Sequence, residues 1–257
     1  MKRHANNIDI RYRIEGNGPC VTLAHSLATD LSLWDRLAAE LAQRFTVLRY
    51  DARGHGQTSA PEGPYDFPTL VADLVGLLDV LKIERTHFVG LSMGGMLGQH
   101  FALAAPQRLD KLVLVSTTSR TPPEGGKLWA ERIATARTQG MTAHVEPTLA
   151  RWFTAPYRAA HPEVMARIGT LITATPVDGF AGWGGAICTL DVTDQLNAVR
   201  APTLVVVGAD DPGTPPALSE TIAAAIPGAR QEIVPNASHQ LVIEQAQTFN
   251  HLLTKFL

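Results

Sequence analysis

In the stretch RTHFVGLSMGGMLGQHF, residues 85–101, one serine, Ser92, lies between Gly90 on one side and Gly94 and Gly95 on the other. Residues 86–89 are typical of a short buried strand, and residues 93–104 have the apolar spacing of a helix. A Gly-x-Ser-x-Gly sequence between a strand and a helix is typical of a nucleophile elbow, a tight turn that exposes a serine hydroxyl at a sheet edge. If a histidine and a carboxylate follow it downstream, Ser92 is a candidate nucleophile; without them, the stretch is an ordinary glycine-rich turn.

The chain has 257 residues, of which 45% are hydrophobic and 18% are charged, and its formal net charge is −2. This length suits one large α/β domain. The charge gives no electrostatic basis for binding nucleic acid or an anionic membrane, and no apolar run is long enough to span a bilayer. The opening MKRHANNIDI lacks the apolar stretch of a signal peptide, so we expect a cytoplasmic protein. Cys20 and Cys188 lack metal-ligand spacing and are expected to be reduced packing thiols.

Apolar and charged residues alternate over residues 8–14, and a glycine-rich turn leads to an apolar segment at 20–25. Alternation with period two predicts a half-buried strand, so we expect these two segments to form an antiparallel hairpin at a sheet edge. Short apolar strands then alternate with helices, which predicts a parallel sheet covered on both faces. The expected strands are 46–51, 86–90 and 111–116, and the expected helices are 68–82 and 93–105.

This alternation stops after Ser116 and returns only at residue 201. The returning pattern predicts a strand within 201–211, a helix at 216–226, a strand at 230–235 and a last helix at 242–256. We therefore predict a core domain of residues 1–120 and 191–257, with residues 121–190 inserted as a helical cap. A loop after a parallel strand emerges at the ligand-binding edge of the sheet, so we expect the cap to cover the site. The alternative is that the insertion only adds packing.

Of the nine histidines, His239 best suits the base that Ser92 requires. It lies in a loop between the last strand and the last helix, at the same sheet edge as the serine. The acid that orients the imidazole is expected at the end of another strand, where Asp210 and Asp211 are neighbours. We predict Asp211, which stands three residues after Gly208, and expect Asp210 to be a turn or solvated residue.

The oxyanion that develops when the serine attacks needs hydrogen-bond donors that are already fixed. One candidate is the backbone N–H of Met93, the residue after the nucleophile. The second is expected in the loop LAHSLATD, residues 23–30, where Leu27 is the candidate. His25 in the same loop could serve as a second base, but we expect it to orient the loop.

Several motifs together resemble those of the α/β-hydrolase superfamily over essentially the whole chain. They are VGLSMGGMLGQ, RYDARGHGQT, HSLATDLSLWD, and GADDPGTPP followed by SHQLVIEQ. Within that superfamily the chain is similar to 3-oxoadipate enol-lactonases and their esterase relatives. This similarity rests on SLATDLSLW, GPYDF, KLWAERI, RWFT and IPGAR.

The resemblance implies an α/β-hydrolase fold, with a mostly parallel sheet, helices on both faces and a helical cap. It implies that Ser92 is the nucleophile, Asp211 the acid and His239 the base of a catalytic triad, with no cofactor and no metal. It also implies that the RGHG segment, which contains His55, is mainly a structural loop. We expect a monomer or a small homo-oligomer.

The chain departs from the lactonase pattern at two places. Ala28 stands where these lactonases usually have glycine, and the cap stretch GFAGWGGAICTLD lacks the paired cysteines usual near Trp183 and Gly184. Because the cap shapes the pockets for the acyl and leaving groups, these departures concern the substrate and leave the chemistry unchanged. We expect hydrolysis of a small ester or lactone, most like 3-oxoadipate enol-lactone. General carboxylesterase activity, perhydrolysis and carbon–carbon bond hydrolysis remain alternatives, whereas a complete triad disfavours a non-catalytic binding module.

Positive charges in the cap could bind an anionic substrate. They are Lys127, Arg132, Arg137, Arg151 and Arg167, and most are expected to be solvated. We predict Trp129 and Arg132 as substrate-binding residues, because their spacing lets both face the same side of a helix. An arginine can hold a carboxylate by two parallel hydrogen bonds.

Overall fold

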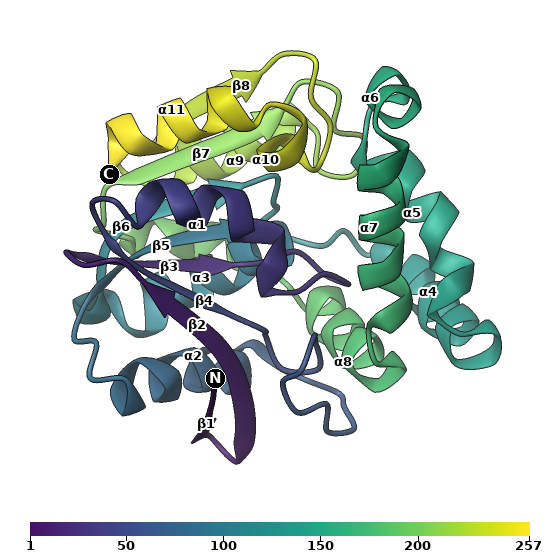
Figure 1. Cartoon of the computed structure of the whole chain (residues 1–257), viewed down its shortest axis with the longest axis horizontal. Coiled ribbons are helices and arrows are strands. Elements are labelled where there is room, and N and C mark those ends of the chain that lie inside the picture. Colours follow the sequence, from purple (N-terminus) through teal and green to yellow (C-terminus); the bar gives the residue numbers. More distant parts are fainter.

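A computed structural model describes all 257 residues and shows one eight-stranded sheet with helices on both faces (Figure 1). The strand order is β1-β2-β4-β3-β5-β6-β7-β8. The strands are β1 (Lys2–Ala5), β2 (Ile8–Glu15), β3 (Cys20–Ala24), β4 (Thr46–Tyr50), β5 (Thr86–Leu91), β6 (Leu109–Val115), β7 (Thr203–Gly208) and β8 (Arg230–Val234). All pairs from β4 to β8 are parallel, whereas β1 pairs with β2, and β2 with β4, in antiparallel fashion.

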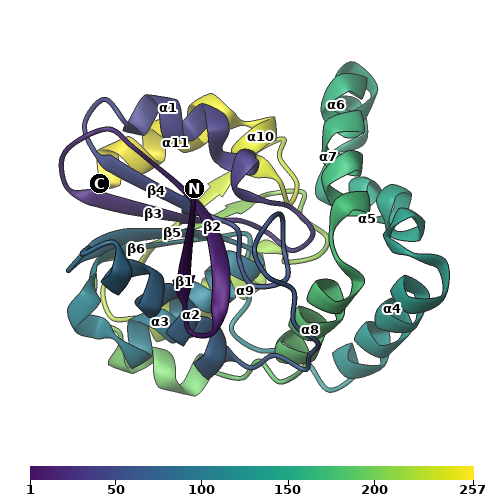
Figure 2. The ribbon, with the colours of Figure 1, turned by 60° about the horizontal axis from the view of Figure 1, so that its bottom comes forward.

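The helices of the core lie in two layers (Figure 2). Helices α1 (Asp35–Leu41) and α11 (Ala246–Phe256) cover one face, and α2 (Phe67–Val80) and α3 (Met93–Ala104) cover the other. Helix α9 (Pro216–Ala225) packs against β7 and β8, and α10 (Leu241–Glu244) precedes α11. All six residues of β5 are buried, as expected for a central parallel strand covered on both faces.

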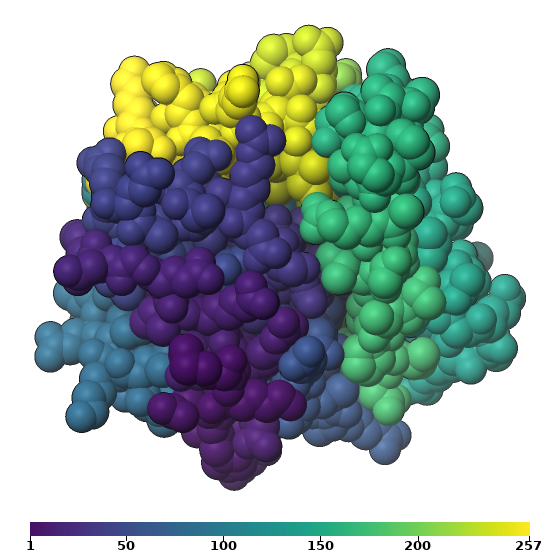
Figure 3. Space-filling view, in the orientation of Figure 1, coloured from purple at the N-terminus to yellow at the C-terminus, as the bar shows by residue number.

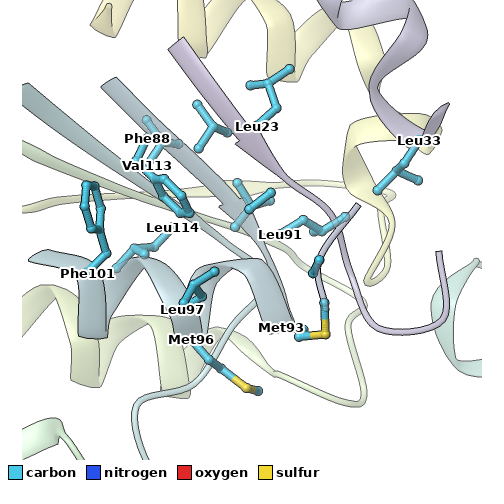
Figure 4. Close-up of a cluster of buried hydrophobic side chains, with 14 of the residues drawn as sticks. Leu23, Leu33, Phe88, Leu91, Met93, Met96, Leu97, Phe101, Val113 and Leu114 are labelled. Atoms are coloured by element: carbon cyan, nitrogen blue, oxygen red, sulfur yellow. The ribbon is translucent and has the colours of Figure 1, made fainter. Parts of the chain in front are cut away.

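Helix α3 packs its apolar side onto β5 and β6 (Figure 4). Leu97 and Phe101 lie against the sheet beside Phe88 and Leu114, and all four side chains are buried. This packing fixes the start of α3, and with it the turn that carries Ser92. None of the helices combines the length and the apolar character that a membrane span requires.

The predicted hairpin between residues 8–14 and 20–25 is wrong, because β4 lies between β2 and β3. Strand β3, of which all residues after Cys20 are buried, takes parallel partners on both sides, and the half-exposed β2 stays outside it. The chain's hairpin joins β1 to β2 instead. Its turn is made by Asn6 and Asn7, whose φ angles of 46° and 62° suit a two-residue type I′ turn.

The last helix, predicted as one segment at 242–256, is interrupted at Gln245, where φ is −123° and ψ is 46°. Glu244, just before the break, is buried, and its carboxylate accepts hydrogen bonds from the N–H groups of Ser238 and Thr154. The hydrophobic pattern of the sequence continues across the break, so it could not reveal these tertiary contacts of Glu244.

Helices α4 to α8 lie beside the core at one end of the sheet (Figure 1). They are α4 (Gly125–Gln139), α5 (Val145–Trp152), α6 (Ala155–Ala160), α7 (Pro162–Ala174) and α8 (Val177–Cys188). In the space-filling view their atoms, teal to green, rest directly against the core (Figure 3). The segment leaves and rejoins the core at one place, since Arg120 and Asp191 form an antiparallel bridge. We use the word cap for residues 121–190.

The glycine-rich end of the cap forms a helix, α8, that lies very close to the loop at residues 53–56. A Cβ atom added at Gly179 would collide with the carbonyl of Gly54, and one at Gly182 would lie 2.6 Å from the ring of Tyr65. Glycine at these positions therefore lets the cap backbone contact the core directly.

Candidate active site

Ser92 lies in the turn between β5 and α3 with φ 56° and ψ −111°, a conformation that is strained for a residue with a side chain. Its backbone is held on both sides. The N–H donates to the carbonyl of Val115 at 2.8 Å, and the carbonyl accepts from Met96 N–H at 3.0 Å and from the Thr117 hydroxyl at 2.8 Å. A strained residue persists where its surroundings fix it in this way, and such residues cluster at functional sites.

The glycines around Ser92 are required by close packing. A Cβ atom at Gly90 would overlap the carbonyl of Gly94, one at Gly94 would overlap the carbonyl of Ala24, and one at Gly95 would lie 2.7 Å from Thr117 Cβ. Strand β5, the start of α3 and the end of β3 therefore approach one another at this point without intervening side chains.

His239 and Asp211 meet at the carboxyl end of the sheet. The Nδ1 atom of His239 lies 2.8 Å from Oδ2 of Asp211, and both side chains are almost fully buried. The other carboxylate oxygen accepts from the N–H groups of Gly213 at 2.9 Å and Thr214 at 3.0 Å, and the Thr214 hydroxyl donates to Oδ2 at 2.6 Å. Asp210 is exposed, so of the two neighbours it is Asp211 that contacts the imidazole.

Two opposing effects act on the pKa of Asp211. Burial alone would raise it, but the neighbouring His239 and the hydrogen bonds from His239 and Thr214 outweigh burial and hold the pKa below its usual range. The carboxylate is therefore ionised at neutral pH. It fixes the His239 tautomer with the proton on Nδ1, which leaves Nε2 available to accept a proton.

Ser92 and His239 line the same cavity, whose volume is about 630 Å³. This volume is in the range that holds a small organic ligand. The structure records no hydrogen bond between the two side chains, and such bonds are often long or poorly aligned without substrate. The ring of Trp152, a cap residue, stacks on His239 with centroids 6.0 Å apart and covers one side of the imidazole.

Two backbone N–H groups beside Ser92 are candidate oxyanion donors. Met93 is the first residue of α3, where an N–H has no acceptor within the helix. In the facing loop, the Ala28 N–H donates to His55 and the Thr29 N–H donates to the carbonyl of Ser26, whereas the Leu27 N–H has no acceptor. Leu27 lines the cavity together with Ser92. Met93 thus follows the serine directly in the chain and Leu27 lines the same cavity, and their role as oxyanion donors stays a prediction.

The predicted substrate-binding pair, Trp129 and Arg132, also lines this cavity. The Arg132 guanidinium lies over the Trp129 ring, 4.1 Å from its centre, and 5.6 Å from the ring centre of Phe180. Burial, and to a lesser extent the positive charge of the nearby Arg151, lower the pKa of Arg132 to about 9. A guanidinium with this pKa is still charged at neutral pH.

Arg151, on α5, is the second cationic residue of the cap that lines the cavity. Burial lowers its pKa too, and neither Arg151 nor Arg132 forms a salt bridge. Arg151 was one of five cap cations in the sequence analysis, and no sequence pattern distinguished it as a substrate-binding residue. The other three, Lys127, Arg137 and Arg167, are exposed and lie outside this cavity. Two positively charged side chains without a salt-bridge partner therefore line the cavity that holds Ser92.

The structure holds no cluster of three or more His, Cys, Asp or Glu residues that could bind a metal ion. His25 belongs to the loop of residues 23–30, which we call the oxyanion loop, and His55 contacts this loop from the segment at 53–56. Nε2 of His25 accepts from Ala52 N–H, and Nε2 of His55 accepts from Ala28 N–H, both at 3.0 Å. Neither histidine lines the cavity. Both roles agree with the expectation that these two residues support loops.

Residues 19–246 match the family model of the alpha/beta hydrolase fold. The chain belongs to this family. It is 32% identical to 3-oxoadipate enol-lactonase 2 of Acinetobacter baylyi over 96% of this chain and 92% of the relative. The crystal structure of an enol-lactonase from Burkholderia xenovorans has a TM-score of 0.96 and 39% identity, covering 100% of this chain and 99% of that one.

A thermophilic esterase from Thermogutta terrifontis, solved with malate bound, is a further neighbour of this α/β hydrolase. It has a TM-score of 0.92 and 29% identity, covering 96% of this chain and 92% of that chain. The predicted fold and the resemblance to enol-lactonases are thus confirmed. The esterase and lactonase relatives support a hydrolase and leave its substrate open.

Proposed function

We propose that this α/β hydrolase is a serine hydrolase that opens a small anionic lactone, or cleaves a small anionic ester, through an acyl-enzyme. The substrate that fits best is of the 3-oxoadipate enol-lactone type. The observation that carries the proposal is the pair Arg132 and Arg151, which bring unpaired positive charge to the cavity that holds Ser92 and His239.

In this mechanism His239 Nε2 accepts the proton of the Ser92 hydroxyl as its oxygen attacks the substrate carbonyl. Asp211 stabilises the imidazolium that forms, through the hydrogen bond to Nδ1. The N–H groups of Leu27 and Met93 stabilise the oxyanion. The C–O bond then breaks, and the leaving oxygen takes the proton from His239. Water, deprotonated by His239, hydrolyses the acyl-enzyme.

The two arginines supply the preference for an anion. A partly buried cation without a carboxylate partner is energetically unfavourable, and a carboxylate that enters the cavity relieves this cost by forming charge-assisted hydrogen bonds. The relatives include an enol-lactonase, whose substrate type carries a carboxylate, and an esterase solved with the dicarboxylate malate. A general carboxylesterase would have no need for two unpaired guanidinium groups beside its nucleophile.

The test compares two p-nitrophenyl esters with the same leaving group and chain length, the mono-ester of adipic acid and the ester of hexanoic acid. We expect kcat/KM to be higher for the anionic ester by at least about 10²-fold, which corresponds to one buried charge pair. The wild-type protein should also hydrolyse 3-oxoadipate enol-lactone. Equal kcat/KM values, or a preference for the hexanoate, would overturn the proposal in favour of a general carboxylesterase.

A further inference from the structure

The loop that carries the Leu27 N–H has an unusual backbone. Ala28, the next residue, is buried and has φ 57°, a left-handed conformation that residues with a Cβ atom adopt at a cost. The N–H groups of Leu27 and Ala28 belong to consecutive peptide groups, which are joined at the Leu27 Cα atom. A contact that fixes the Ala28 N–H therefore also restricts the direction of the Leu27 N–H. Something must hold this conformation against its strain.

His55 supplies the holding contact. Its Nε2 accepts a hydrogen bond from Ala28 N–H at 3.0 Å, and because a backbone N–H only donates, this contact assigns the ring proton to Nδ1. Nδ1 then donates to the carbonyl of Arg53 at 3.2 Å. Burial, and to a lesser extent the neighbouring His25, lower the pKa of His55 to about 3, so the ring stays neutral and Nε2 keeps its lone pair.

The same Arg53 carbonyl has a second donor, which comes from the cap. The indole N–H of Trp183, a fully buried residue of α8, donates to it at 2.8 Å. The rings of Trp183 and His55 meet edge to face, with centroids 6.3 Å apart. One carbonyl oxygen therefore joins the cap helix to the histidine that holds the oxyanion loop.

We propose that His55 is a positioning residue for the oxyanion hole, and that Trp183 couples it to the cap through the Arg53 carbonyl. This inference rests on the proposed function, because it takes Leu27 as an oxyanion donor. The donor must lie within hydrogen-bond distance of the oxyanion, and a displacement of about 1 Å in an active site can cost about 10²-fold in rate. His55 does not reach the cavity, so it acts only through the loop.

Two substitutions at His55 separate positioning from packing. In His55→Leu the side chain fills the site but cannot accept from Ala28 N–H, whereas in His55→Gln an amide oxygen can replace Nε2 as the acceptor. For p-nitrophenyl esters we expect His55→Leu to lower kcat by about 10²-fold with little change in KM, because the oxyanion contact forms only in the transition state. The Gln variant should recover most of this loss. Circular dichroism and the unfolding midpoint establish that both variants are folded.

A third variant, Trp183→Phe, keeps an aromatic ring and removes the indole N–H. We expect a smaller fall in kcat than in His55→Leu, and no further fall when the two substitutions are combined, because residues in one network are not additive. Fully additive losses in log kcat would overturn the coupling to the cap.

The turnover of Ser92→Ala and the pre-steady-state burst of p-nitrophenol together distinguish failure of this inference from failure of the proposed function. A Ser92→Ala protein that keeps wild-type turnover of the ester overturns the proposed function, and the inference with it. A wild-type protein that gives the burst, beside a folded His55→Leu variant with the same burst rate and the same kcat, overturns the positioning role alone. A slower burst in His55→Leu that is restored in His55→Gln supports it.

Discussion

His239 Nδ1 lies 2.8 Å from Asp211 Oδ2, while Asp210, the preceding residue, is exposed. The two aspartates therefore form a matched pair for testing which carboxylate orients the imidazole. We expect Asp211→Asn to lower kcat by about 10⁴-fold, the loss known for the corresponding change in a serine protease, because an amide favours the wrong tautomer. Asp210→Asn should keep nearly full activity. Steady-state assays with a p-nitrophenyl ester decide, and greater damage in Asp210→Asn would contradict the assignment.

Stability at low pH should depend on Asp211. Burial opposes its ionisation, but His239 and the Thr214 hydrogen bonds prevail and lower its pKa in the folded protein. The unfolded value is about 3.9, so the stability that Asp211 contributes is present above about pH 4 and is lost as pH falls through the folded value. We expect the free energy of unfolding to fall less in Asp211→Asn than in the wild type between pH 6 and pH 3. Urea unfolding at each pH measures this, and parallel curves for both proteins would argue against it.

Arg132 and Arg151 are expected to act on anionic substrates only. Arg132→Gln and Arg151→Gln should each lower kcat/KM for the adipate mono-ester by about 10²-fold and change that for the hexanoate ester little. Arg137→Gln is the control, because Arg137 lies on the same helix as Arg132 but is exposed and outside the cavity. Equal losses on both esters in an arginine variant would show that this arginine supports the structure and does not bind the substrate.

The end of α2 offers a test of the fold itself. Lys82 is exposed and has φ 58°, and the bonds Ile83 N–H to Leu78 carbonyl (2.9 Å) and Lys82 N–H to Asp79 carbonyl (3.0 Å) form a Schellman motif. Glycine is unstrained in this conformation, so Lys82→Gly should raise the free energy of unfolding by about 1 kcal/mol.

The control for this change is Ala134→Gly, at an exposed position in the middle of α4, which should lower the free energy of unfolding by about 1 kcal/mol. Chemical denaturation of both variants provides the comparison. A destabilised Lys82→Gly variant would mean that the side chain stabilises the helix end by an interaction that the structure does not show.

The parts of the site that sequence could predict are those that local chemistry dictates. Short motifs predicted the serine between close-packed glycines. The rule that parallel strands end at one edge of the sheet predicted the histidine after the last strand and the acid after the preceding strand. The strand order at the amino-terminal edge of the sheet could not be predicted from sequence. Strands β3 and β4 pair across 20 or more intervening residues, and the turn at 15–19 resembles that of a hairpin.

Contacts between the cap and the core are beyond sequence reasoning for the same reason. Arg151 could not be distinguished from four other cap cations, since only the packing of α4 and α5 decides which ones face the cavity. The hydrogen bond from Trp183 to Arg53 spans 130 positions in the chain, and no periodicity connects those residues. The break at Gln245 follows from the tertiary contacts of Glu244, which the helical pattern cannot reveal.

The proposed mechanism depends on acylation of Ser92. Wild-type protein mixed with the p-nitrophenyl mono-ester of adipic acid, quenched in acid within the burst phase and analysed by mass spectrometry, should gain one adipoyl group. Peptide mapping should place this group on Ser92. Ser92→Ala should gain none and lose activity on the order of 10⁶-fold, as removal of the nucleophile does in subtilisin. Turnover without an adduct, or an adduct on another residue, would contradict the account.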